Sequence, residues 1–200
     1  MSSTTRKPMS LDAFLAWEEA QPMKYEFDGF APVAMTGGTQ EHAIIQGNTI
    51  TTLSNRLRGT GCRAYGSDFK IVVDGSIRYP DAFVRCSQSP RGATLANDPV
   101  VVFEILSPST SRIDRIVKAR EYGNTASIQR YIILEQTIQA ATVFTRTNGA
   151  WMSVVVEGDV DLPMPEIGIT VPLADFYEDV EFPPDEADTA KRLLDLDHRP

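Results

Sequence analysis

Short apolar runs alternate with polar segments along the chain, and their spacing switches between the periods of helices and strands. Apolar residues recur at helical spacing over residues 10–20, where Ser10 is the predicted N-cap, and over residues 40–58, which begin at Thr39 or Gln40. A third helix is predicted over residues 111–122. We expect the second helix to bury Ala43, Ile44, Ile50, Leu53 and Leu57.

Strand-like segments fill most of the remaining chain, and Asx-Gly turns connect several of them as hairpins. The turns are Asp28-Gly29, Asp74-Gly75 and Asn148-Gly149. Residues 100–106 are nearly all apolar, which is typical of a strand that is covered on both faces near the centre of a sheet. Further strands are expected at residues 63–65, 69–73, 77–85, 130–135, 142–147 and 151–156, with a polar loop over 87–98 and an irregular crossing over 163–168. The pattern predicts an α/β fold, a mixed sheet with helices against it.

Composition and charge are those of a folded domain. The chain has 200 residues, of which 42% are hydrophobic and 23% charged. We expect one domain over residues 1–182 and an acidic tail over 183–200. The net charge of −8 is concentrated at the end, because residues 157–200 hold 13 acidic and 3 basic side chains. The preceding residues hold 14 acidic and 16 basic side chains, so their charge does not exclude a polyanionic partner.

Cysteine usage and hydropathy exclude several classes of protein. Cys62 and Cys86 lie in no C-x-x-C motif, and His42 and His198 are far apart, which argues against a structural zinc site. We expect both cysteines to be thiols in the core. The apolar runs are too short to span a bilayer, and no secretory signal is visible. We therefore expect a cytoplasmic protein with no membrane partner.

Two carboxylates stand out against the strand pattern. Asp81 follows Pro80 within a predicted strand, and Glu104 lies inside the most apolar strand of the chain. A carboxylate buried there costs several kcal/mol unless it is paired, protonated or bound to a cation. On adjacent strands the two would form a site for a hard divalent metal. Lys118, two turns into the third predicted helix, could reach back toward Glu104 and orient a metal-bound water.

These positions carry a resemblance to a known family. Tyr79-Pro80-Asp81, a spacer of 22 residues and Glu104-Ile105-Leu106 resemble the PD-(D/E)XK nuclease superfamily, which has the restriction endonuclease-like fold. Over residues 10–180 the chain is similar to the Uma-type family of restriction endonucleases. The motifs concerned are Tyr25-Glu26, Asp28-Gly29, His42 at a helix start, Pro80-Asp81, residues 104–110 (Glu-Ile-Leu-Ser-Pro-Ser-Thr), and Asp114, Lys118 and Tyr122.

The resemblance implies a role for each residue. Asp81 and Glu104 would be metal ligands, and Glu26 would be a third acidic group near the metal. Lys118 would replace the lysine that the superfamily motif places where this chain has Leu106. The implied protein is a restriction endonuclease-like homodimer that uses Mg²⁺ or Mn²⁺ to hydrolyse DNA phosphodiester bonds.

Each assignment has a structural alternative. Asp81 alone is compatible with a turn, Glu26 with a hydrogen bond to backbone, and Lys118 with an ion pair to Asp114 on the helix surface. His42 suits a helix cap and a site-lining position about equally, and Gln46 lies one turn further on the same side.

Basic residues suited to a nucleic acid form two sets. Arg112 and Arg115 are candidates for phosphate contacts beside the site, although charged helix faces are commonly only solvated. The full sets are Arg56, Arg58, Arg63 and Lys70, and Arg112, Arg115 and Arg120.

Two other functions compete with a nuclease. The broken short motif, the modest number of basic residues and the acidic C-terminal stretch suit a catalytically silent nucleic-acid-binding or regulatory module on the same fold. A metal-dependent hydrolase for a small phosphate ester has less support, because no phosphate-binding loop is visible.

Overall fold

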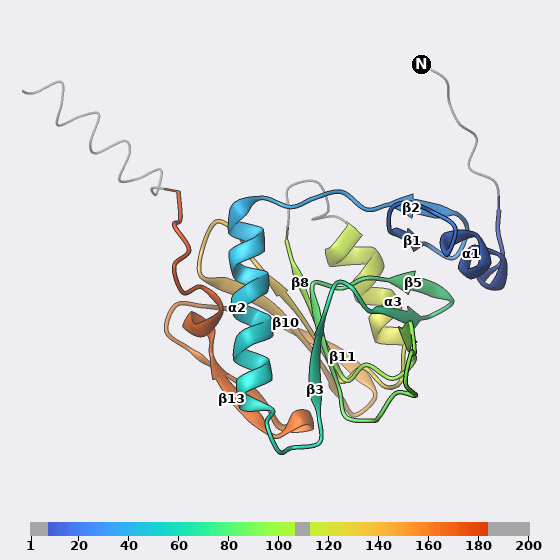
Figure 1. Ribbon diagram of the computed structural model, residues 1–200. Coiled ribbons are helices and arrows are strands. Elements are labelled where there is room, and N and C mark those ends of the chain that lie inside the picture. Colours follow the sequence, from blue (N-terminus) through green and yellow to red (C-terminus); the bar gives the residue numbers. More distant parts are fainter. Residues whose placement is uncertain (1–7, 107–112, 184–200) are drawn as a thin grey trace, which may run out of the picture.

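A six-stranded mixed sheet forms the centre of the computed structural model, which describes residues 8–106 and 113–183 (Figure 1). Neighbouring strands are antiparallel except for the parallel pair of β8 and β9. In spatial order the strands are β11 (Ala150–Glu157), β10 (Ala140–Thr147), β9 (Arg130–Leu134), β8 (Val101–Ile105), β6 (Ala82–Arg85) and β3 (Arg63–Gly66). The prediction of an α/β fold with a mixed sheet is confirmed.

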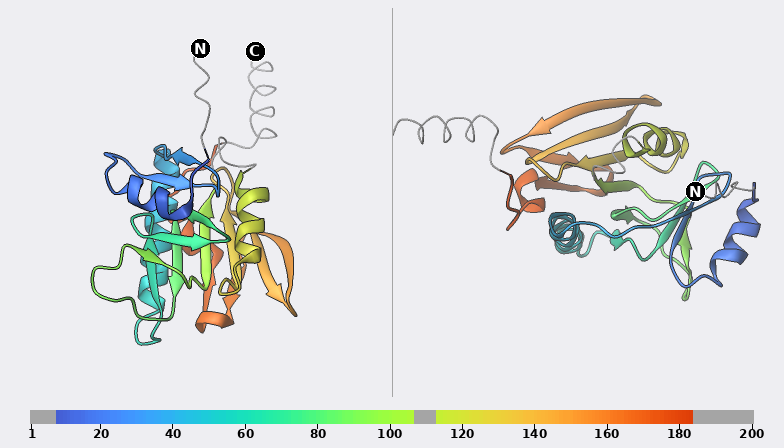
Figure 2. Two further views of the ribbon diagram at one scale, coloured as in Figure 1. Left: turned by 90° about the vertical axis from the view of Figure 1, so that its right-hand side faces the viewer. Right: turned by 90° about the horizontal axis from the view of Figure 1, so that it is seen from above.

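Helices cover both faces of this sheet, as the view from above in Figure 2 shows. On one face lies α2 (Gln40–Arg56), which buries Ile45 and Leu53 against Phe103 of β8. On the other lie the π-helical turn η1 (Ile113–Lys118) and α3 (Ala119–Asn124), which buries Tyr122. The latter two form the crossover between β8 and β9 that a parallel pair of strands requires.

Two smaller sheets flank the central one. A five-stranded sheet consists, in spatial order, of β2 (Pro32–Ala34), β1 (Tyr25–Phe27), β5 (Ser76–Arg78), β4 (Lys70–Val73) and β7 (Leu95–Ala96), and α1 (Leu11–Glu18) packs against it. A two-stranded sheet of β12 (Asp161–Met164) and β13 (Ile169–Pro172) contains the turn η2 (Pro165–Ile167) and leads to η3 (Leu173–Phe176). No helix in the described part of the chain is both long and apolar enough to cross a membrane.

Local sequence signals are confirmed at both long helices and at the hairpins. Ser10 and Thr39 each accept a hydrogen bond from a backbone N–H of the first turn, at 3.2 Å, as N-caps do. Strand β8 is buried along its whole length and lies inside the sheet, as its apolar run predicts.

The strand predicted over residues 77–85 is wrong, because Pro80 divides it. Proline lacks the N–H that a strand interior requires. The first part becomes β5 of the five-stranded sheet and the second becomes β6 of the central sheet. Asp81 therefore lies at the junction of the two sheets, directly before β6.

Four further expectations need correction. Along α2 and at its end, Leu53 and Leu57 are buried as predicted and Ile44 and Ile50 are half-buried. Ala43 is exposed, and Ile45 and Thr49 are buried instead, because the helix face over the sheet repeats every four residues. Strand β7 lies within the predicted polar loop, and β12 and β13 lie within and beside the predicted irregular crossing. The third helix extends to Asn124 and starts with a π-helical turn. The start predicted at Ser111 and the tail from residue 184 lie outside the described residues.

Cys62 and Cys86 form a disulfide bond and are not core thiols. The register of β3 and β6 explains the pairing, since Arg63 lies opposite Arg85. One step further along this antiparallel pair, Cys62 and Cys86 lie opposite each other. The two cysteines are 24 residues apart in sequence, and only strand pairing brings them together.

Candidate active site

Strand register brings Asp81 and Glu104 to the same level of the central sheet. Ala82 of β6 pairs with Phe103 of β8, so Asp81 and Glu104 are opposite one step beyond. Asp81 directly precedes β6, and its carboxylate is contacted from α2, whereas Glu104 is contacted from η1 and α3. Asp81 also accepts a hydrogen bond through Oδ2 from the Ile105 backbone N–H, at 2.7 Å. The two carboxylates are thus positioned by backbone that is itself part of the core.

Residues of α2 contact the other oxygen of Asp81. His42 Nε2 lies 3.2 Å from Asp81 Oδ1, and the two side chains are 17% and 14% exposed. Gln46 Nε2 donates to Asp81 Oδ1 at 3.3 Å and to the Asp81 carbonyl at 3.1 Å. The structure therefore places His42 at the site, one turn from Gln46, and not on an exposed helix end.

Glu104 is buried, with 4% of the residue exposed, and receives donors from the opposite helix. Lys118 Nζ donates to Glu104 Oε1 at 2.9 Å, and the Tyr122 hydroxyl donates to the same oxygen at 2.7 Å. Burial, and then the negative charge of Glu104, raise the pKa of Tyr122 well above its usual value. Tyr122 therefore stays protonated and keeps donating to Glu104.

Lys118 also connects the site to a buried charge network at the five-stranded sheet. Its Nζ lies 3.7 Å from Glu26 Oε1. Glu26 accepts from Arg78 at 2.9 Å and from the Tyr79 backbone N–H at 3.2 Å. Arg78, only 2% exposed, also binds both oxygens of Glu121 at 2.7 Å.

The charges of this network hold one another in place. Although burial acts to lower the pKa of Arg78, the hydrogen bonds that it donates to Glu121 and the charges of Glu26 and Glu121 raise it overall. Arg78 is therefore cationic at any physiological pH and stabilises both carboxylates.

The donor set suits a hard cation at Asp81 and Glu104. Four carboxylates (Glu26, Asp81, Glu104 and Glu121) face two cations (Lys118 and Arg78), which leaves two negative charges when His42 is neutral. Carboxylate oxygens are the ligands that Mg²⁺ prefers. In the described residues, however, no three His, Cys, Asp or Glu side chains are gathered as a metal site.

Of the two predicted phosphate contacts, only Arg115 lies among the described residues, and it is already paired. Arg115 forms an ion pair with Glu135 and a hydrogen bond of 3.2 Å with Thr142 Oγ1. Arg112 and the side chain of Asp114 lie outside the described residues.

Sequence reasoning missed Arg78 and Glu121, and it assigned no role to Tyr122. Arg78 carries the signal that identified Glu104, a charged residue beside apolar residues in a strand. Glu121 follows Lys118 by one helical turn, a spacing that a surface ion pair shares, so the sequence held no signal for it.

Comparison with known proteins decides the family. A family model, Uma2, described as "Putative restriction endonuclease", matches residues 11–174. The chain belongs to the Uma2 family. An uncharacterized protein of Synechocystis sp. is 30% identical over 178 residues, which cover 87% of this chain and 94% of that protein.

A solved structure shares the fold of this Uma2 chain. It is the crystal structure of a protein from Anabaena variabilis described as a "putative nuclease belonging to DUF820". The match has a TM-score of 0.68 and 18% sequence identity, and it covers 86% of this chain and 98% of the other. The description of the family supports a nuclease, and the solved structure supports the fold.

Proposed function

We propose that this protein is a divalent-metal-dependent endonuclease that hydrolyses DNA phosphodiester bonds. The observation that supports it best is the placement of Asp81 and Glu104 at one level of adjacent strands, with the Lys118 ammonium 2.9 Å from Glu104. Two carboxylates and a lysine are the groups that the PD-(D/E)XK resemblance implies. Here the lysine comes from η1 and not from β8, which explains why the short motif has Leu106 in its place.

Each residue has a role that follows from its contacts. Asp81 and Glu104 would hold Mg²⁺ or Mn²⁺. Glu26, whose Oε1 lies 3.7 Å from Lys118 Nζ, would add negative charge near the metal. The bound metal supplies Lewis acidity toward the phosphate and its leaving oxygen. Lys118 orients the attacking water, whose oxygen bonds to phosphorus as the P–O ester bond breaks. Tyr122, Gln46 and the Ile105 N–H keep the two carboxylates in place.

The second candidate is a catalytically silent nucleic-acid-binding module. It is favoured by one observation: Lys118 already contacts two carboxylates, and one Glu104 oxygen already receives two donors. A module of this kind binds DNA with salt-dependent affinity but does not cleave it.

Nicking of supercoiled plasmid in Mg²⁺ or Mn²⁺ separates the two candidates. We expect metal-dependent nicking that falls by at least about 100-fold in Asp81→Asn, which removes the charge of a proposed metal ligand, and in Lys118→Met, which removes the ammonium that orients the attacking water. Lys24→Met is the control, since Lys24 is an exposed cation that belongs to neither basic set. DNA binding without nicking, or nicking that both variants retain, would leave the silent module as the function.

A further inference from the structure

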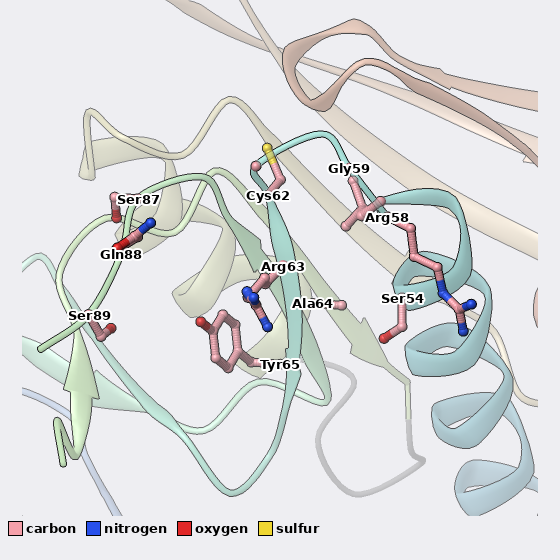
Figure 3. Close-up of a pocket in the computed structure, with 12 residues that line it drawn as sticks. Ser54, Arg58, Gly59, Cys62, Arg63, Ala64, Tyr65, Ser87, Gln88 and Ser89 are labelled. Carbon is pink, nitrogen blue, oxygen red and sulfur yellow. The ribbon is translucent and has the colours of Figure 1, made fainter. Parts of the chain in front are cut away.

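An open groove of about 900 Å³ follows the outer edge of β3, away from the carboxylate site. Figure 3 shows Ser54 on α2 and Arg58 just after this helix on one side of β3, and Arg63 and Tyr65 turned toward residues 87–89 on the other. Strand β3 ends the six-stranded sheet. The outer edge of such a strand carries backbone N–H groups that pair with no neighbouring strand.

The lining of this groove has no acidic residue, although the chain carries a net charge of −8. Its polar groups are mainly guanidinium, hydroxyl and amide groups. Ser87 and Ser89 already accept hydrogen bonds from Arg85, and Ser87 donates to Asp98, so the arginines of the lining supply the charge open to a ligand. The lining residues are Ser54, Leu57, Arg58, Gly59, Gly61, Cys62, Arg63, Ala64, Tyr65, Ser87, Gln88 and Ser89. A concave surface of this composition concentrates positive potential and suits an anionic ligand.

The two arginines keep their charge available to a ligand. Of the basic set that the sequence indicates, Arg56 is paired with Asp175 at 2.7 Å and Lys70 with Glu18. Arg58 instead donates to the neutral side chain of Asn55, at 3.1 Å, and Arg63 is exposed at the start of β3. Among the described residues, no carboxylate lies within ion-pair distance of Arg58 or Arg63.

The strand itself connects the groove to the candidate active site. Strand β3 runs from Arg63 to Gly66, and Gly66 pairs with Ala82, the residue after Asp81. Three residues of extended chain span about 10 Å. Successive phosphates of one DNA strand advance by about 3.4 Å along the helix axis, so the groove lies within a few nucleotides of a phosphate held at Asp81.

We infer that this groove binds the phosphate backbone of duplex DNA beside the bond that is cleaved. The inference rests on the proposed function and names the surface that holds its substrate. Arginine and serine side chains and backbone N–H groups make most contacts to DNA phosphates, and such contacts fix the position of the duplex without selecting a sequence. Arg58 and Arg63 are thus positioning residues for the substrate, at a distance from the chemistry.

Binding of a fluorescein-labelled DNA duplex, followed by anisotropy over a salt series in EDTA, tests the inference without cleavage. The variant is Arg58→Ala/Arg63→Ala. The control is Lys24→Ala/Arg91→Ala, which removes the same charge from two exposed residues that belong to neither basic set and do not line the groove. We expect the groove variant to bind more weakly. The magnitude of the negative slope of log K, the association constant, against log salt should decrease by about 2, one for each lost phosphate contact. The control should keep the slope of the native protein.

The outcomes for the groove and for the nuclease differ. Equal binding by the groove variant and the control, or no duplex binding by the native protein, would contradict the inference that the groove binds DNA. Plasmid nicking is measured on the same preparations. Binding that depends on Arg58 and Arg63 without any metal-dependent nicking supports the groove and overturns the nuclease.

Discussion

At the scale of single residues, the candidate site consists of buried charged groups that stabilise one another. Glu104 and Lys118 are 4% and 7% exposed, and each is acceptable in the core only because the other is present. Tyr122 adds an uncharged donor to Glu104, so the carboxylate keeps one hydrogen bond whatever happens to the lysine. The geometry of the site and the stability of the fold therefore depend on the same contacts.

A double-mutant cycle at Glu104 and Lys118 measures this dependence apart from activity. We expect Lys118→Met to lower the free energy of unfolding by about 3 kcal/mol, because it leaves Glu104 and Glu26 buried without their shared cation. The double variant Lys118→Met/Glu104→Gln should cost clearly less than the sum of the single changes. Urea denaturation gives all three values. Strictly additive costs would contradict the coupling. The control Arg120→Met, at an exposed residue of α3, should leave the free energy of unfolding nearly unchanged.

At the scale of elements, the register of β3, β6 and β8 explains three separate contacts. One step beyond the register of β6 with β8, Asp81 lies opposite Glu104. One step beyond the register of β3 with β6, at the opposite end of β6, Cys62 lies opposite Cys86. The same strand β3 carries Arg63 at its start and reaches the level of Asp81 at its end. A slip of one residue would turn Glu104 toward the α2 face and away from Lys118.

The disulfide is the element-scale feature whose removal has a calculable cost. A cross-link between residues 24 apart reduces the entropy of the unfolded chain, and its loss should cost about 3 kcal/mol. We expect a reductant to shift the urea midpoint of the native protein downward by the same amount as Cys62→Ala/Cys86→Ala. The double variant itself should be insensitive to reductant. Two titratable thiols in the unfolded, unreduced protein would contradict the bond.

At the scale of the whole molecule, the packing of three layers of secondary structure buries polar aromatic groups. Burial raises the pKa of Tyr79, Tyr122 and Tyr177, which come from the five-stranded sheet, α3 and the segment after η3. The hydrogen bond that Tyr79 donates to Glu18 reinforces this rise. The Tyr177 hydroxyl donates to the Ala140 carbonyl. The protonated hydroxyls connect elements that are distant in the sequence.

The alkaline limit of stability follows from these tyrosines. The folded protein holds their protons above pH 10.0, where the unfolded chain releases them. The free energy of unfolding is therefore unaffected by these groups below about pH 10 and falls above it, by about 1.4 kcal/mol per pH unit and tyrosine. Urea denaturation between pH 9 and 11, with tyrosinate absorbance in the native and unfolded protein, measures the effect. Full ionisation at the usual pH without unfolding would contradict it.

The sequence by itself determined most of the elements, because their signals are local. Helix caps at Ser10 and Thr39, Asx-Gly turns and the apolar run of β8 depend on neighbouring residues only. A charged residue in an apolar strand is also a local signal, and it identified Glu104. Asp81 and Lys118 were assigned through the spacing of motifs along the chain.

Only the tertiary structure decided which of these residues meet. That Glu26 reaches Lys118 and Arg78 reaches Glu121 depends on the packing of the five-stranded sheet against α3, which no local pattern encodes. Pro80 divides residues 77–85, but the sheet that each part joins depends on the tertiary structure. The disulfide and the groove along β3 depend on strand order and register, which are set by contacts between residues far apart in the chain. The hydrophobic effect stabilises the burial of any apolar face, so a sequence pattern determines that an element is buried. The shapes of all the elements together determine which element packs against it.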